Sequence, residues 1–193
     1  QAIDDFSRAI EIDSDYFYAL ANRGDCYQAL EEYLPALKDY TECLRIMPSN
    51  PLVLDERGDC YQALGEYQQA VLEYSKAIEL DPDYFHPLMQ RAYCYYRLGQ
   101  VEEAIEDYEK TLRIQPNNDR MFAMRGLIYV EEGNYQRGVE DFSAAILNNP
   151  QGPDYYEMRA DCYRKMGMDL EAAADDRKAT ELKNGTFVDD LPF

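Results

Sequence analysis

The chain has 193 residues, of which 46% are hydrophobic and 30% charged, and a formal net charge of −19. This balance is typical of a folded protein and excludes a disordered one. The surplus of acids argues against nucleic acid as a partner, because phosphate binding requires clustered Lys and Arg. No apolar run approaches the ~20 residues that a membrane helix needs, so we expect no contact with a membrane.

Cysteine and histidine usage argues against a metal centre. The chain has one histidine, His86, and an odd number of cysteines without CxxC spacing: Cys26, Cys43, Cys60, Cys94 and Cys162. These residues do not form the usual zinc-ligand patterns, so we expect no metal and no cofactor. The cysteines suit small packing residues in a reduced compartment, and we predict a cytoplasmic location.

The chain opens with one helix and continues as helix pairs with a period of 34 residues. Residues 1–16 predict a half repeat, and five full repeats follow at 17–50, 51–84, 85–118, 119–152 and 153–186. Each full repeat has an arginine, a small residue directly after it and a tyrosine four places later. The arginines are Arg23, Arg57, Arg91, Arg125 and Arg159, and the tyrosines are Tyr27, Tyr61, Tyr95, Tyr129 and Tyr163.

Turn residues separate the two helices of each pair. Glycine can adopt positive φ and end a helix, and it recurs at Gly65, Gly99, Gly133 and Gly167. Proline disfavours helical geometry in the residue before it, and it ends the second helix at Pro48, Pro82, Pro116 and Pro150. Within the second helix a small residue precedes an aromatic residue by four places, which puts both on one helical face. The small residues are Ala36, Ala70, Ala104, Gly138 and Ala172.

This pattern of small, tyrosine, alanine, aromatic and proline positions resembles the tetratricopeptide repeat family over residues 1–186. The resemblance implies an all-α fold, a right-handed superhelical solenoid of antiparallel helix pairs. It also implies that the first helix of each pair lines a concave groove. Because one pair cannot bury its apolar face alone, stability comes from contacts between neighbouring pairs. We expect a single array over residues 1–186.

The repeated arginine differs from the family's commonest pattern, which has an apolar residue there. Acids recur in phase with it at Asp5, Asp39, Glu73, Asp107, Asp141 and Asp175. We therefore predict a structural ladder of partly buried Arg–carboxylate pairs, bidentate where geometry permits. Two registers are open: Arg57 pairs with Asp39 of the preceding repeat or with Glu73 of its own. We favour the pair across repeats.

The two ends of the array differ in character. The opening half repeat keeps an apolar face, so we expect more protein upstream of Gln1. The last helix is polar at Asp169, Asp176 and Thr180, as a capping helix should be. We expect the tail, residues 187–193, to fold back on this cap, to lie in a neighbouring molecule's groove, or to fray.

Family analogy assigns partner contacts to set positions of the first helices. The candidate groove residues are Tyr18, Asn22, Asp25, Asp55, Glu56, Asp59, His86, Met89, Gln90, Tyr93, Tyr96, Arg97, Arg120, Met124, Leu127 and Val130. The early members are mostly acidic, and the later ones include methionine, tyrosine and leucine. We therefore predict a protein or peptide partner with apolar anchors and a basic end. The alternative is that several of the Met and Tyr side chains pack between helices.

Some members of the family grip the C-terminal carboxylate of heat-shock chaperones with Lys, Asn and Arg. The corresponding positions of the first three repeats hold Ala21, Asp25, Glu56, His86 and Gln90. Acids repel a carboxylate, so we do not expect this role.

The leading hypothesis is a scaffold or adaptor that binds a polypeptide segment. We do not expect an enzyme, because the sequence has no phosphate-binding glycine loop, nucleophile elbow or metal-ligand cluster. One alternative is a structural module that self-associates end to end or through its tail. Another is a regulatory repeat domain of a larger multidomain protein.

Overall fold

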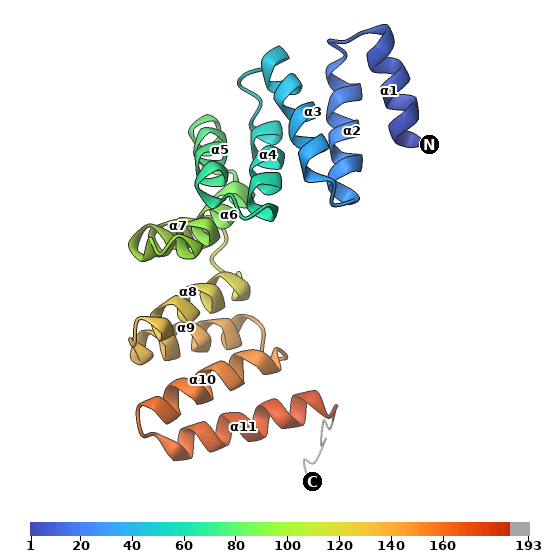
Figure 1. The fold of residues 1–193 in the computed structure, drawn as a ribbon. Helices are drawn as coiled ribbons and strands as arrows, with labels where there is room; N and C mark the ends of the chain where they lie inside the picture. The colour runs from blue at the N-terminus through green and yellow to red at the C-terminus, as the bar shows by residue number, and fades with distance from the viewer. Residues whose placement is uncertain (186–193) are drawn as a thin grey trace. The chain divides into compact units, whose positions relative to one another are not determined.

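The computed structural model describes residues 1–185, which form eleven helices and no strand (Figure 1). The all-α prediction is thereby confirmed. None of these helices is both long and apolar enough to cross a membrane. Their bounds are α1 Ala2–Ile12, α2 Phe17–Ala29, α3 Tyr33–Ile46, α4 Pro51–Ala63, α5 Tyr67–Leu80, α6 Phe85–Arg97, α7 Val101–Ile114, α8 Asp119–Glu131, α9 Tyr135–Asn148, α10 Pro153–Lys165 and α11 Asp169–Lys183. The prediction for the tail falls on residues 187–193, which lie outside the described residues.

The helices belong to two compact units, one covering Gln1–Asp107 and one that begins at Tyr108. In the first unit α2 packs on α3 and α4 on α5 as hairpins, and α3–α4 and α5–α6 contacts join successive hairpins. Helix α4 also contacts α6, so first helices of neighbouring hairpins meet directly. In the second unit α8 pairs with α9 and α10 with α11, and α9 packs on α10. Helix α7 crosses the boundary between the units.

The turns within hairpins use the left-handed backbone region, as predicted for the glycines. Gly65, for example, has φ of +78°. Its amide donates to the Gln62 carbonyl and the next amide donates to the Tyr61 carbonyl, which ends α4. The first hairpin has Glu31 at this position, with φ of 60°. A residue with a side chain is strained in this region, so the backbone of the α2–α3 turn is less favourable than that of the turns that have glycine.

Aromatic residues of the second helices fit against glycines of the first helices. Tyr40 and Tyr74 are almost fully buried. A Cβ added at Gly24 would lie 2.7 Å from Cε1 of Tyr40, and one at Gly58 would lie 2.5 Å from Cε1 of Tyr74. These distances are below normal contact, so each glycine provides the space that the tyrosine ring of its own hairpin fills.

The recurring arginines pair with the acids sixteen residues later, on the second helix of the same hairpin. Arg23 donates from Nε and Nη2 to the two carboxylate oxygens of Asp39, at 2.8 and 2.7 Å. Arg91 with Asp107, Arg125 with Asp141 and Arg159 with Asp175 repeat this bidentate geometry. All these acids are buried. Such pairs fix the two helices of a hairpin in rotation as well as in distance.

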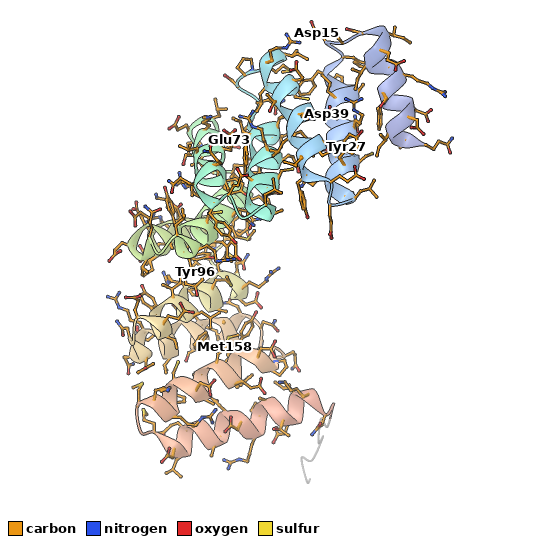
Figure 2. All side chains as sticks on the ribbon, in the orientation of Figure 1. Asp15, Tyr27, Asp39, Glu73, Tyr96 and Met158 are labelled. Carbon is orange, nitrogen blue, oxygen red and sulfur yellow. The ribbon has the colours of Figure 1, made fainter. Side chains whose placement is uncertain are left out.

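The favoured pairing across repeats is wrong. Arg57 donates to Oε2 of Glu73 in its own hairpin, at 3.1 Å from Nε and 2.6 Å from Nη2. Arg23 pairs with Asp39 instead. Asp39 lies on α3 and Glu73 on α5, so each acid is on the second helix of the hairpin that holds its arginine (Figure 2). Asp5 is exposed on α1 and pairs with no arginine among residues 1–185.

The same arginines also contact the helix that precedes their own hairpin, and four of the five contact a hydroxyl group there. The Nη1 atom of Arg23 donates to Ser7 Oγ at 2.9 Å. Arg57, Arg91 and Arg159 make the same contact, each with the hydroxyl of the residue sixteen places before it. Those residues are Thr41, Ser75 and Ser143. At the equivalent place Arg125 lies 3.8 Å from Glu109. Each guanidinium therefore links its own hairpin to the second helix before it.

Candidate functional site

The first helices of the first unit hold most of the candidate groove residues. Tyr18, Asn22 and Asp25 on α2 are exposed, and Glu56 and Asp59 on α4 are half-buried. On α6, Arg97 is exposed and the remaining candidates are half-buried: His86, Met89, Gln90, Tyr93 and Tyr96 (Tyr96 is labelled in Figure 2). These side chains are accessible to a ligand in the unit as it stands.

Asp55 departs from the prediction that it faces a partner. It is only 2% exposed, because residues of the following hairpin cover it. The His86 Nδ1 atom lies 2.9 and 3.0 Å from its two carboxylate oxygens, and the Tyr84 hydroxyl is hydrogen-bonded to it. Asp55 is therefore part of the α4–α6 contact and is not a free recognition group.

Two acidic candidates are held by the core tyrosines. The Tyr40 hydroxyl lies 2.8 Å from Asp25 Oδ1 and 2.9 Å from Gln28 Oε1. One period later the Tyr74 hydroxyl lies 2.6 Å from Asp59 Oδ1, and Gln62 takes the place of Gln28. A buried hydroxyl needs a partner, so the tyrosine inside each of these two hairpins fixes the acid at the hairpin's surface.

The second unit has an apolar version of the same arrangement. Phe142 replaces the tyrosine, and Leu127 and Val130 replace the acid and the glutamine at the same spacings. Val130 is packed against the core cluster around Phe142, so its prediction as a partner contact is not supported by its surroundings. Leu127 and Arg120 are exposed, and Met124 is half-buried.

The acids of α4 lie in an environment that disfavours their charge. We call Asp25, Asp55, Glu56 and Asp59 the acidic cluster. Burial raises the pKa of Glu56 and the pKa of Asp59, and neighbouring carboxylates raise both further. The hydrogen bond with Asp55 raises the pKa of His86. Among residues 1–185 no lysine or arginine pairs with a member of this cluster.

A second cluster lies at the α5–α6 hairpin contact. The Arg97 guanidinium is 4.6 Å from the ring centroid of Tyr67 and 5.6 Å from that of Tyr93, and its Nη1 donates to the Tyr93 hydroxyl at 2.6 Å. The two rings meet edge to face. This arrangement holds Arg97 by cation–π attraction and orders the aromatic surface beside the acidic cluster.

Burial keeps the thiols between hairpins in their unreactive, protonated form. Burial raises the pKa of Cys60 and Cys94 to about 12 and that of Cys162 to about 11, so these groups stay protonated at neutral pH. Cys60 and Cys94 lie near the side-chain oxygens of Gln28 and Gln62, at 3.4 and 3.2 Å. They act as small packing residues between hairpins.

Comparison with known families identifies the fold. Models of the tetratricopeptide repeat match residues 17–50, 58–99, 87–118 and 123–185, which together cover most of the chain. The chain belongs to the tetratricopeptide repeat family. Comparison with curated proteins gave no match.

Solved structures share this tetratricopeptide repeat fold. MamA from Desulfovibrio magneticus RS-1 is 21% identical, with a TM-score of 0.82, over 89% of this chain and 97% of that one. YrrB, described as a TPR protein with an unusual peptide-binding site, is 18% identical, with a TM-score of 0.76, over 94% and 93%. A repeat protein from Parabacteroides merdae is 25% identical, with a TM-score of 0.78, over 92% and 71%. These likenesses establish the architecture.

Several residues of this repeat surface were missed by sequence reasoning. Tyr84 precedes α6, and Tyr16 is the only other tyrosine at this place, while Asn50, Asn118 and Gly152 occupy it elsewhere. The position of Asp55 gave a mixed signal, because alanine occupies it in two repeats and Met89 and Glu157 occupy it in two others. Ala123 is buried but Ala21, Met89 and Glu157 are half-buried, so the period alone left the burial of Asp55 open.

We predict that the protein is more stable at about pH 5.5 than at about pH 7.5. His86, Glu56 and Asp59 all have raised pKa values in the folded state. These three groups therefore hold their protons to a higher pH in the folded chain than in the unfolded chain. The stability that each contributes is lost as the pH rises through its folded-state pKa. Thermal unfolding followed by circular dichroism at both pH values measures the difference.

The matched control is the variant His86→Gln, Glu56→Gln, Asp59→Asn. The remaining net negative charge also disfavours folding at higher pH, so some dependence persists. We expect the difference in melting temperature to shrink in the variant. An unchanged difference would show that the acidic cluster is not its source.

Proposed function

We propose that this tetratricopeptide repeat protein is a non-catalytic interaction scaffold. Its first unit would bind a partner segment through a basic side chain at the acidic cluster and an apolar anchor on α6. The single observation behind this proposal is the lack of a lysine or arginine beside Asp25, Glu56 and Asp59 among the described residues. A partner's cation would supply the missing charge.

The location of these groups supports a ligand that runs across hairpins. Asp25 lies on α2, Glu56 and Asp59 on α4, and Met89 and Tyr93 on α6. The α4–α6 contact brings successive first helices together, so one extended segment is able to meet acids and then apolar groups. Methionine and aromatic side chains are common anchors at interfaces. In the second unit, taken by itself, Met124 and Leu127 are proposed as apolar partner contacts.

A related fold supports the class of ligand. YrrB is described as binding peptide, and its architecture covers nearly all of this chain. The likeness concerns the fold, and the binding of peptide is transferred to this chain as part of the proposal. The repulsion between carboxylates disfavours an acidic ligand.

The test is selection from a random peptide library displayed on phage, with the whole chain as bait. We expect selected peptides to be enriched in Lys or Arg beside Leu, Phe or Met. A labelled selected peptide should bind the variant Glu56→Gln, Asp59→Asn roughly tenfold more weakly or worse, as expected for the loss of a charged hydrogen bond.

The matched control neutralises two exposed acids elsewhere in the same unit, Glu102→Gln with Glu103→Gln. This control should bind as the wild type does, apart from a small change in salt dependence. Equal binding by both variants would remove the acidic cluster from the proposal. Enrichment of acidic peptides would reject it.

A further inference from the structure

Asp55 differs from every other buried carboxylate in residues 1–185. The others each pair with an arginine of their own hairpin: Asp39, Glu73, Asp107, Asp141 and Asp175. Asp55 is paired with His86 instead, which carries a charge only when it is protonated. A buried carboxylate is costly without a cation, and the other buried acids each have a permanently charged arginine. Among these acids, Asp55 alone therefore has a partner that is able to give up its proton and act as a metal ligand.

The donors around Asp55 form a compact mixed set. One carboxylate oxygen each from Asp55 and Asp59 and one imidazole nitrogen of His86 all lie within 4.8 Å of one another. Asp55 and Asp59 are one helical turn apart on α4, and His86 comes from the first turn of α6 in the next hairpin. Tyr84 and Gln90 orient the two carboxylates through hydrogen bonds, and the Gln90 bond to Asp59 is 3.4 Å long.

We propose that Asp55, Asp59 and His86 bind a divalent first-row transition-metal ion. Zinc is the probe we choose, because it accepts mixed imidazole and carboxylate ligands at about 2.0–2.2 Å. An imidazole nitrogen disfavours magnesium and calcium, which prefer oxygen ligands. Three protein ligands leave a position open for water or a partner's donor group.

The charges around the site favour this ion. Glu56 directly follows Asp55 on α4 and adds negative charge close to the two ligand carboxylates. Even with a protonated His86 the cluster of four acids keeps a surplus of negative charge. A divalent ion offsets more of that charge than the imidazolium does. Because the ligands come from α4 and α6, the bound ion would also link two successive hairpins.

This site has no recognisable signal in the sequence. Asp55 and Asp59 are ordinary helical acids, and His86 follows them at a distance of 31 residues from Asp55. No zinc-ligand motif has this form. Only the contact between two first helices brings the three side chains together.

The experiment titrates the chelator-treated full chain with zinc, using no peptide. The chain has one histidine, so its imidazole NMR signals report on His86 without overlap. We expect a saturable change of these signals, together with one equivalent of bound zinc by calorimetry. The variant Asp59→Asn should bind zinc at least tenfold more weakly, and His86→Gln should abolish the single equivalent.

The control variant Glu102→Gln with Glu103→Gln should bind zinc as the wild type does. Asp55 is left unchanged because it is buried, and circular dichroism checks that each variant is folded. Imidazole signals that do not move at millimolar zinc would overturn the proposal. So would an equivalent of zinc that both site variants keep. Should His86→Gln not fold, the NMR titration of Asp59→Asn decides alone.

Discussion

Replacing Arg125 with methionine is expected to lower the free energy of unfolding by about 3–5 kcal/mol. The substitution leaves the Asp141 carboxylate inside the α8–α9 hairpin without its bidentate partner, and that side chain is only 7% exposed. Methionine fills much of the same volume, so the loss comes from the orphaned charge and not from a cavity. Urea unfolding followed by circular dichroism measures the effect.

The double variant Arg125→Met, Asp141→Leu separates charge from packing. Replacing both partners of a buried pair with apolar residues is often neutral or stabilising, so most of the loss should be recovered. Asp141→Leu alone should cost less than Arg125→Met, because the guanidinium is more exposed, at 17%, and is able to reach water. A double variant no more stable than Arg125→Met would mean that the pair is not what holds the hairpin.

Gly58→Val is expected to lower the free energy of unfolding by about 2–4 kcal/mol. The added Cβ would lie 2.5 Å from the Tyr74 ring, which is fully buried and cannot swing away. Displacing the ring also breaks the hydrogen bond between its hydroxyl and Asp59. Replacing glycine with valine improves the helix propensity by less than about 1 kcal/mol, so the steric clash determines the sign of the effect. Valine is chosen because the third repeat has Ala92 at this position.

Two comparisons isolate the clash. Ala63→Val, at an exposed position of the same helix, should change stability by no more than about 0.5 kcal/mol. In a Tyr74→Leu background the cost of Gly58→Val should fall, because the smaller side chain leaves room. A cost that stays the same there would place the strain somewhere other than the aromatic ring.

The fold class and the family were predictable because a strict period constrains every hairpin alike. The turn glycines and the small and aromatic positions each recur once per repeat, so the repeated evidence outweighs the uncertainty of any single residue. The arginine ladder was harder. Asp39 and Glu73 lie at similar distances from Arg57 along the chain, on opposite sides of it. Which of these two acids pairs with Arg57 depends on how each helix is rotated about its axis, and the spacing of residues along the chain does not determine that rotation.

The candidate surface was less predictable than the fold. The family analogy identified the first helices as the candidate surface but treated Asp55 and Glu56 alike. In the structure Asp55 is buried and Glu56 is half-buried. The link between Tyr74 and Asp59 was readable in principle, because Phe142 and Leu127 change together at the same spacing. The grouping of Asp55, Asp59 and His86 was not, since it depends on a contact between two hairpins.

The arginine pairs also bear on how such a protein changes its length during evolution. Each charge pair closes within one hairpin, and only a neutral hydroxyl or a distant glutamate reaches the hairpin before. Duplication or loss of a whole 34-residue segment would therefore leave each of these arginines with its own buried carboxylate.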